Sequence, residues 1–225
     1  MTFIYPKILA IDTSTDACSA ALLVDHKIND QFIVAPKQHT KLILSMINEL
    51  LNEAQLELNQ LDAIAFGSGP GSFTGVRLAT SIVQGFAFAA NLPVIKISTL
   101  RILAQEVFIE FKAPKVLVAQ DARMQEVYFG EYGVDNKGIM QEIKPDSLIK
   151  PENITKICAD GFIGVGSGFE VYRDIFSQRC NIKIIDRKYA QAKYMLQLAE
   201  FEFAKGNMVS AKEALPTYLR EKVVQ

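Results

Sequence analysis

Apolar residues follow a strand-like pattern at the start of the chain and a helical period soon after. Short β-prone runs predict three consecutive strands, at residues 7–11, 18–24 and 27–34. Further on, the apolar positions recur with a helical spacing, which predicts an amphipathic helix at 39–56 whose main stripe is Ile43, Ile47, Leu50 and Ala54. A buried strand at 62–67, a helix at 73–90 and a strand at 93–97 are expected next.

This order of elements is typical of an α/β lobe of ribonuclease H-like type, in which helices cover a mixed sheet. The start of the second half repeats the pattern of the first strand pair, with an apolar strand, an Asp turn and a new strand. Leu117, Val118, Ala119 and Asp121 correspond to Ile8, Leu9, Ala10 and Asp12. The repeat predicts a duplicated lobe, with a chance match as the alternative.

The chain is therefore expected to form two domains, 1–110 and 111–225, with the extreme C-terminal segment free to pack back on the first. Patterns in the second half are weaker. Residues 162–170 indicate a strand, a glycine turn and the start of a helix. Residues 189–205 predict a helix that ends at Gly206. Its inward-facing residues are expected to be Ala192, Met195, Leu196, Ala199 and Phe203.

Charge excludes one class of function. With 24 basic and 25 acidic residues the net charge is −1, so the chain has no basic field of its own to hold nucleic acid. The N-terminal run is broken by charges and is expected to be neither a signal peptide nor a membrane span. An odd number of cysteines without paired spacing indicates free thiols in a reducing, cytoplasmic compartment: Cys18, Cys158 and Cys180.

A glycine-rich turn, GSGPGSFTG at 67–75, joins a predicted strand to a predicted helix. Its backbone amides, at Gly69, Gly71 and Ser72, and the dipole of the helix could hold an anion. It is neither a Walker A loop, because Val76 and Arg77 follow it, nor a dinucleotide fingerprint, whose third glycine is here Ser72. The alternative is a structural turn in which glycine permits positive φ and Ser72 caps the helix.

Arg77 is the only charged residue between Ala63 and Ile95, and it lies in the first helical turn, where a cation opposes the helix dipole. An arginine there is expected to meet a carboxylate or a phosphate. One face of this helix is small and apolar, as suits packing on a sheet: Val76, Ala79, Val83, Ala87 and Ala90. The opposite face has the composition of an interface centre, with burial by the chain's second lobe as the alternative: Thr74, Arg77, Leu78, Ser81, Gln84, Gly85 and Phe88.

Asp12 and Asp121 each end a predicted strand in a short turn. In two-lobed ATPases such carboxylates hold a hydrated metal near nucleotide phosphates, and Thr13 and Ser14 would complete the first of these turns. The alternative is that each carboxylate bonds nearby backbone amides. Ser14 stands where such turns commonly have glycine, which narrows the room for a phosphate. A further glycine turn could face a nucleoside or be purely structural: Gly164, Gly166 and Gly168.

Catalytic chemistry finds little support in the sequence. The two histidines, His26 and His39, are too far apart in the chain for a helical metal pair. No G-x-S-x-G elbow occurs, and no cysteine has a histidine within its own motif. We therefore expect no catalytic residue, no metal site and no intrinsic cofactor.

Four segments together resemble the TsaB family, also called YeaZ. They are LAIDTST at 9–15, DAIAFGSGPGSFTGVR at 62–77, DARMQEVY at 121–128 and LPTYLR at 215–220. The resemblance spans the chain, and residues 67–77 carry its most specific part. It implies the two-lobed fold of the actin, Hsp70 and sugar-kinase superfamily. It also implies a role in making threonylcarbamoyladenosine, on the adenosine 3′ of the anticodon, in tRNAs that read codons beginning with A.

The resemblance implies a division of labour as well. Transfer of the threonylcarbamoyl group belongs to a paralogue, TsaD, which binds metal through a His-x-x-x-His motif, and an ATPase, TsaE, joins the two. This chain would be a non-catalytic dimerisation subunit that binds TsaD through the helices at about 40–54, with Leu42 and Met46, and 73–90. A second copy would replace TsaD in isolation. ATP with Mg²⁺, and tRNA, would be bound only at the level of the complex.

Two other classes of function stay open at this point. A free-standing ATPase or small-molecule kinase is supported by the turns at Asp12 and Asp121. A metallopeptidase, a label attached to relatives of the family, would need a metal for which the sequence offers no cluster of ligands.

Overall fold

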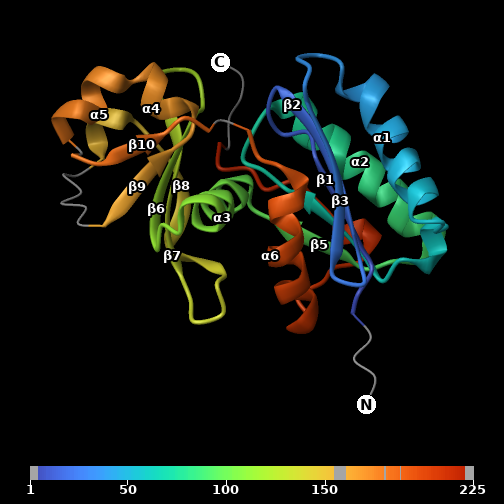
Figure 1. Cartoon of the computed structure of the whole chain (residues 1–225). Helices are drawn as coiled ribbons and strands as arrows, with labels where there is room; N and C mark the ends of the chain where they lie inside the picture. Colours follow the sequence, from blue (N-terminus) through green and yellow to red (C-terminus); the bar gives the residue numbers. More distant parts are fainter. Residues whose placement is uncertain (1–4, 155–160, 180, 188, 221–225) are drawn as a thin grey trace. The chain divides into compact units, whose positions relative to one another are not determined.

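The computed structural model of the protein describes residues 5–154, 161–179, 181–187 and 189–220 (Figure 1). Within these residues the chain divides into two compact units. The first unit holds the chain up to Ile102 and again from Ala190 to Thr217. The second holds the chain from Leu103 to Tyr189 and continues from Tyr218. Each unit is built on one five-stranded sheet.

The sheet of the first unit starts as a three-stranded antiparallel meander and continues with two parallel strands, in the order β3-β2-β1-β4-β5. β2 and β3 are joined by a two-residue turn in which Asp25 and His26 both have positive φ, 48° and 63°. This backbone matches the twist of the flanking strands and fixes their register. The strands are β1 (Ile8–Asp12), β2 (Ala17–Val24), β3 (Lys27–Val34), β4 (Ala63–Gly67) and β5 (Val94–Ile97).

Helices cover both faces of this sheet. Cys18 and Ala20 of β2 share an apolar core with α1 and α2, whereas Ser19, which points the other way, accepts a hydrogen bond from Ala192 N of α6 (2.8 Å). Figure 1 shows α1 and α2 on one side of the sheet and α6 on the other. The helices of this unit are α1 (His39–Glu53), α2 (Phe73–Ala90) and α6 (Ala192–Ala204), with the 3-10 turns η1 (Leu58–Gln60) and η3 (Ala211–Glu213).

The sheet of the second unit repeats the topology of the first. Its order, β8-β7-β6-β9-β10, has the same antiparallel and parallel pairs in the same succession. The strands are β6 (Lys115–Asp121), β7 (Val127–Val134), β8 (Met140–Ile149), β9 (Phe162–Val165) and β10 (Lys183–Ile185). The helices are α4 (Ser167–Val171), α5 (Arg173–Arg179) and η2 (Pro151–Asn153), while α3 (Thr99–Phe111) runs across the division between the units.

This repeated topology confirms the predicted fold class, α/β with two ribonuclease H-like lobes of the actin, Hsp70 and sugar-kinase superfamily. The correspondence between the strands at Ile8 and Leu117 also holds, because β1 and β6 are the central strands of their sheets and each is followed by an antiparallel partner. The fold therefore consists of two copies of one supersecondary plan.

The sequence led us to expect a boundary near residue 110, with the extreme C-terminal segment free to pack back on the first lobe. The division lies at Ile102, inside α3, and residues 190–217 return to the first unit. They return because α6 packs on β1, β2, β4 and β5 and buries Met195, Leu196 and Ala199 completely. Phe203, expected to point inward, is half-buried.

Two further findings concern the chain as a whole. No helix among the described residues is long and apolar enough to cross a membrane. Cys18 is a free, buried thiol, while Cys158 and Cys180 lie outside the described residues.

Candidate functional site

Helix α2 begins where the glycine-rich turn leaves the sheet. Ser72 precedes its first residue, and its side chain accepts a hydrogen bond from Gly75 N (3.4 Å), which satisfies one of the free amides of the first turn. The helix ends at Asn91, whose φ of 52° is left-handed. Its inner face packs on the sheet as predicted, through Val76, Ala79, Val83 and Ala87, with Ala90 half-buried.

The outer face of α2 is exposed at its two ends and in its middle. Phe88 is 85% exposed, and Phe73, in the first turn, is 54% exposed. The predicted interface residues of α2, with Leu42 of α1, divide into an exposed and a half-buried set. The exposed set is Thr74, Ser81, Gly85 and Phe88, and the half-buried set is Arg77, Leu78, Gln84 and Leu42 of α1.

Two of these residues are engaged within the chain. Met46 of α1, expected in the interface, is only 6% exposed and packs in the core of the first unit beside Ile43 and Ile47. It is buried because it lies on the inner stripe of α1. Gln84 donates a hydrogen bond from Nε2 to Ala214 O (3.2 Å), which ties α2 to η3.

Arg77 makes its local contacts with the first turn of its own helix. Its guanidinium lies 3.2 Å from the centroid of the Phe73 ring, and Nη1 donates to Phe73 O (3.1 Å). A cation over an aromatic face is attracted by the negative charge of the ring face. This contact keeps the guanidinium against the Phe73 ring, so that Arg77 and Phe73 present one combined aromatic and cationic area. The sequence argument missed Phe73, although aromatic and arginine residues four apart lie on one helix face.

Helix α1 adds an apolar side chain to the exposed surface of this layer. Leu44 is 52% exposed. We name the outer faces of α1 and α2 the helix surface, defined by Leu42, Leu44, Phe73, Thr74, Arg77, Leu78, Ser81, Gln84, Gly85 and Phe88. An exposed set of large apolar side chains with one arginine is typical of protein interfaces.

The glycine-rich turn and the turn after β1 are brought together, as the anion hypothesis requires, but they bond to each other. Ser72 N donates to Ser14 O (2.7 Å), and Thr13 Oγ1 donates to Gly75 O (2.7 Å). A Cβ on Gly71 would lie 2.5 Å from Ser14 O, and one on Gly75 would overlap Thr13 O. Gly71 and Gly75 therefore allow the close packing of two turns, while Gly69, with a φ of 103°, has the positive φ that the structural alternative expected.

Two carbonyl groups of this turn are also used within the first unit. Thr217 N donates to Ser68 O (2.7 Å), and Thr99 N donates to Gly69 O (3.0 Å). A Cβ on Gly69 would lie 2.9 Å from Thr217 O. The tail that follows η3 thus crosses over the turn, and its sequence LPTYLR was part of the family signature.

Asp12 is completely buried between these turns. Its Oδ1 accepts hydrogen bonds from Ser14 N (3.0 Å) and Ser14 Oγ (2.8 Å), while Oδ2 is buried without a hydrogen-bond partner and lies against Gly67. Burial raises the pKa of this carboxyl to about 6, although the two bonds from Ser14 oppose the rise. Burial, with a smaller contribution from Asp12, also raises the pKa of the Cys18 thiol to about 11. Asp12 is therefore sealed inside the protein.

Asp121 occupies the matching place in the second unit, in a more open environment. Its Oδ1 accepts from Arg123 N (3.0 Å) and Tyr172 Oη (3.3 Å), and Oδ2 pairs with Arg123 Nη1 (3.2 Å). The adjacent Gly turn begins with Gly166 at a φ of 115°. Asp121 N donates to Ser167 Oγ (3.0 Å), so the structure brings the Asp121 turn and the Gly turn together.

The glycines of that second turn serve close packing. A Cβ on Gly166 would overlap Ala119 O, and one on Gly168 would lie 2.9 Å from the same oxygen. A Cβ on Gly164 would lie 3.0 Å from Ile182. Among the described residues, no three His, Cys, Asp or Glu side chains are grouped so that they could hold a metal ion.

Comparison with known proteins places this geometry in a family. The model of the TsaD family, described as tRNA N6-adenosine threonylcarbamoyltransferase, matches residues 31–224. The chain is 39% identical to the tRNA threonylcarbamoyladenosine biosynthesis protein TsaB of Escherichia coli, over 96% of each chain. It is 42% identical to the protein of the same name from Haemophilus influenzae, over 96% of this chain and 94% of the relative.

A solved structure agrees with these relatives. YeaZ from Pseudomonas aeruginosa superimposes with a TM-score of 0.88 at 39% identity, covering 95% of this chain and 100% of that one. These matches extend over nearly the whole length and include the glycine-rich turn, the helix surface and the crossing tail. The chain therefore belongs to the family described by the TsaD model and, within it, to the TsaB (YeaZ) group of tRNA threonylcarbamoyladenosine biosynthesis proteins.

Proposed function

We propose that this protein is a non-catalytic subunit in the synthesis of tRNA threonylcarbamoyladenosine and that its helix surface binds TsaD. The observation that carries the proposal is the exposure of Phe88 and Phe73 on a helix whose other face is fully packed. Large apolar side chains left in water lose about 1.5–3 kcal/mol each relative to burial, so a partner that covers them gains that free energy. The relatives named TsaB supply the pathway in which such a partner is expected.

The chemistry of the helix surface indicates what TsaD would present to it. The small residues of α2, Ser81 and Gly85, allow a facing helix to approach closely. Arg77, held against Phe73, offers a cation at the edge of the contact, where a carboxylate of the partner would be favoured. A facing helix with apolar residues and one acidic side chain is therefore the complement we propose. In isolation, a second copy of this chain takes that place.

The arrangement of the turns supports the non-catalytic part of the proposal. In the first unit, one carboxylate oxygen of Asp12 is held by Ser14 and the other lies against Gly67, so neither is presented to solvent. The amide of Ser72 is used by Ser14 O. In this proposal the transfer step belongs to TsaD, and ATP with Mg²⁺, TsaE and tRNA are engaged at the level of the complex.

The test measures binding and transfer together. Purified chain and TsaD are mixed and followed by analytical ultracentrifugation, and threonylcarbamoyl transfer to tRNA is assayed with TsaE present. Arg77→Glu and Ser81→Arg are expected to weaken the heterodimer by about tenfold or more and to lower transfer in parallel. Arg173→Glu, the same charge reversal on α5, is the matched control and should leave both unchanged.

The outcomes separate the alternatives. Failure to form a heterodimer, or transfer that is unaffected by either variant, would contradict the proposal. Tight stoichiometric binding of ATP with Mg²⁺ to the isolated chain, accompanied by turnover, would favour a free-standing ATPase or kinase. Stoichiometric zinc or iron in the purified protein would favour a metallopeptidase instead.

A further inference from the structure

The tail that follows η3 is fixed at two points beside α2. At the first point Ala214 is completely buried in the core of the first unit, and its carbonyl accepts the hydrogen bond from Gln84 of α2 (3.2 Å). At the second point Thr217 N donates to Ser68 O (2.7 Å), in the turn that precedes α2. The tail therefore runs beside α2, from the second half of the helix towards its first residue.

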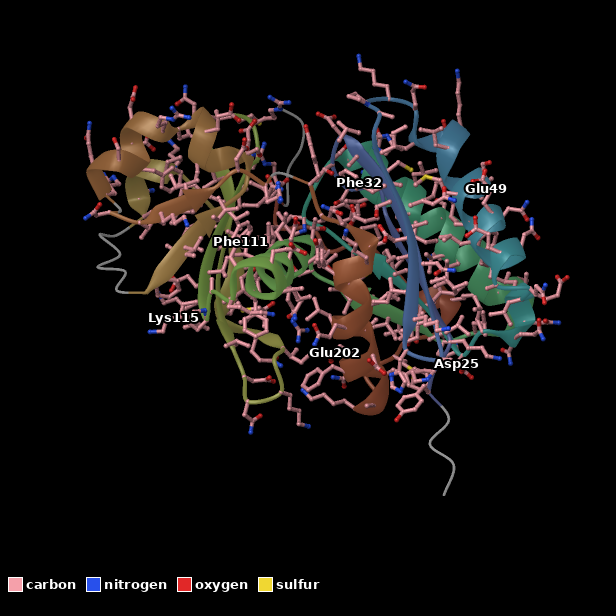
Figure 2. The ribbon with its side chains drawn as sticks, in the orientation of Figure 1. Asp25, Phe32, Glu49, Phe111, Lys115 and Glu202 are labelled. Atoms are coloured by element: carbon pink, nitrogen blue, oxygen red, sulfur yellow. The ribbon has the colours of Figure 1, made fainter. Side chains whose placement is uncertain are left out.

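The order of the elements across the sheet places α2 between α1 and this tail. α1 packs on β2 and β3, α2 packs on β1 and β4, and Val209, just before η3, bridges to β5 at the edge of the sheet. Gln84, which bonds to the tail, shares its side of α2 with Arg77, because residues seven apart in a helix point in nearly the same direction. The tail therefore borders the Arg77 flank of the helix surface. α1, on which Figure 2 labels the exposed Glu49, borders the other flank.

Leu215 is an exposed apolar side chain on this anchored tail. It directly follows the buried Ala214 and is itself 55% exposed. Its amide donates to Glu213 O (2.8 Å), and the next residue, Pro216, has a fixed φ. A side chain on a backbone that is already constrained loses little conformational entropy when a partner covers it. Leu215 is therefore suited to act as a binding anchor.

We propose, on the basis of the function proposed above, that Leu215 extends the helix surface onto the tail and is covered by the same partner, TsaD. Continuity carries the choice of partner. Gln84 belongs to the helix surface and bonds to the residue before Leu215, so a partner that covers Gln84 meets Leu215 next. The partner presents an apolar side chain to Leu215, on the same flank as the carboxylate that Arg77 favours.

Titration of the purified chain with TsaD, followed by analytical ultracentrifugation, measures the contribution of Leu215. Leu215→Ser is expected to raise the dissociation constant of the heterodimer about fivefold or more, because the apolar area that the partner covers is removed. Leu215→Met keeps an apolar side chain of similar volume and should stay within about twofold of the wild-type chain. Val171→Ser, at an equally exposed apolar residue of α4, is the matched control and should leave the constant unchanged.

Photo-cross-linking tests the contact without relying on affinity. A benzophenone amino acid in place of Leu215 is expected to form a covalent product with TsaD when the mixed proteins are irradiated, whereas the same amino acid in place of Val171 is not. Mass spectrometry of the product identifies the TsaD peptide that covers the tail. A product with TsaE or tRNA, formed in place of one with TsaD, would overturn the choice of partner.

Comparison with the α2 variants distinguishes failure of this inference from failure of the proposed function. If Arg77→Glu and Ser81→Arg weaken the heterodimer but Leu215→Ser does not, the tail lies outside the interface, and only the inference about Leu215 fails. If none of the three variants changes the dissociation constant, both fail. A weaker heterodimer that comes with a lower melting temperature of Leu215→Ser, and that Leu215→Met does not restore, would make Leu215 a support of the fold and would also overturn the inference.

Discussion

Replacing Asp12 by Asn should change how the stability of the protein depends on pH. The carboxyl is fully buried and its pKa is raised from 3.8 to about 6, so the folded state binds the proton more tightly than the unfolded chain does. Below pH 3.8 the carboxyl is protonated in both the folded and the unfolded state, so its ionisation does not lower the free energy of unfolding. As the pH rises through 6, the folded state must bury a charge that the unfolded chain keeps in water. Each tenfold change in the ionisation constant is worth about 1.4 kcal/mol, which makes the full penalty about 3 kcal/mol.

Asn keeps the oxygen that accepts the two hydrogen bonds from Ser14 but cannot ionise. Urea denaturation of both proteins from pH 4 to pH 8 gives the difference in unfolding free energy at each pH. We expect this difference to move in favour of the variant by about 2 kcal/mol over that range. Any constant cost of burying the Asn amide cancels in the comparison. Asp16→Asn, at an exposed aspartate in the same turn, controls for the loss of a charge. A difference that stays constant from pH 4 to pH 8 would refute the reasoning.

Three further predictions concern stability and can be checked by the same denaturation assay. Gly75→Ala should destabilise the fold by about 3 kcal/mol or more, because the added Cβ would overlap Thr13 O. Gly85→Ala should be neutral or slightly stabilising, because nothing lies within 4 Å of its added Cβ, and equal effects of the two variants would contradict this account. Met46→Ala should lower the free energy of unfolding by about 2–5 kcal/mol and Leu44→Ala by under about 1 kcal/mol, since only the Met46 side chain is buried. The reverse order would show that α1 turns a different face toward the sheet. Burial alone would raise the pKa of Glu202, but hydrogen bonds from Asn207 (2.6 Å) and Arg101 (2.8 Å) lower it overall, so the ionised carboxylate stabilises the fold at neutral pH and this stabilisation is lost on acidification. Glu202→Gln should therefore destabilise the protein at pH 7 and progressively less below pH 4.5. A difference in unfolding free energy that does not change with pH would count against the ion pair.

Local patterns were sufficient to predict the first lobe. The short β-prone runs of β1 to β3, the stripe of Ile43, Ile47 and Leu50, and the glycine turn before α2 are signals contained in short windows, and each element forms close to where it was expected. Helix α3 was missed because it is almost wholly buried over residues 99–107, with polar Gln105 and Glu106 included, so its sequence shows no clear polar face to mark the period. β8 was missed because its apolar alternation is interrupted by charges and Pro145.

For the candidate site, too, the sequence predicted local features but not every contact. The helical spacing of residues 73–90 separated the two faces of α2 correctly, since spacing alone decides which residues of a helix share a side. Helical spacing also places Met46 on the inner stripe of α1 with Ile43 and Leu50, so the sequence contained the signal for its burial. It could not show that Arg77 lies on Phe73, because that contact depends on a side-chain rotamer. Likewise, the sequence left open whether Asp12 meets a ligand or its own backbone. The structure shows that Ser14, two residues further on, holds one oxygen of Asp12 and that Gly67 lies against the other.

The return of α6 to the first sheet has a consequence for synthesis of the protein on the ribosome. One face of that sheet is covered by a helix encoded some 90 residues after β5, the last strand of the sheet. Until residues 192–204 have left the exit tunnel, the apolar side chains that contact α6 have no cover, and the nascent chain carries an unfinished lobe. Synthesis proceeds at about 5–20 residues per second, so this exposure lasts for several seconds in every molecule. A chaperone that holds the half-made chain would therefore matter more for this protein than for one whose lobes are each completed in sequence.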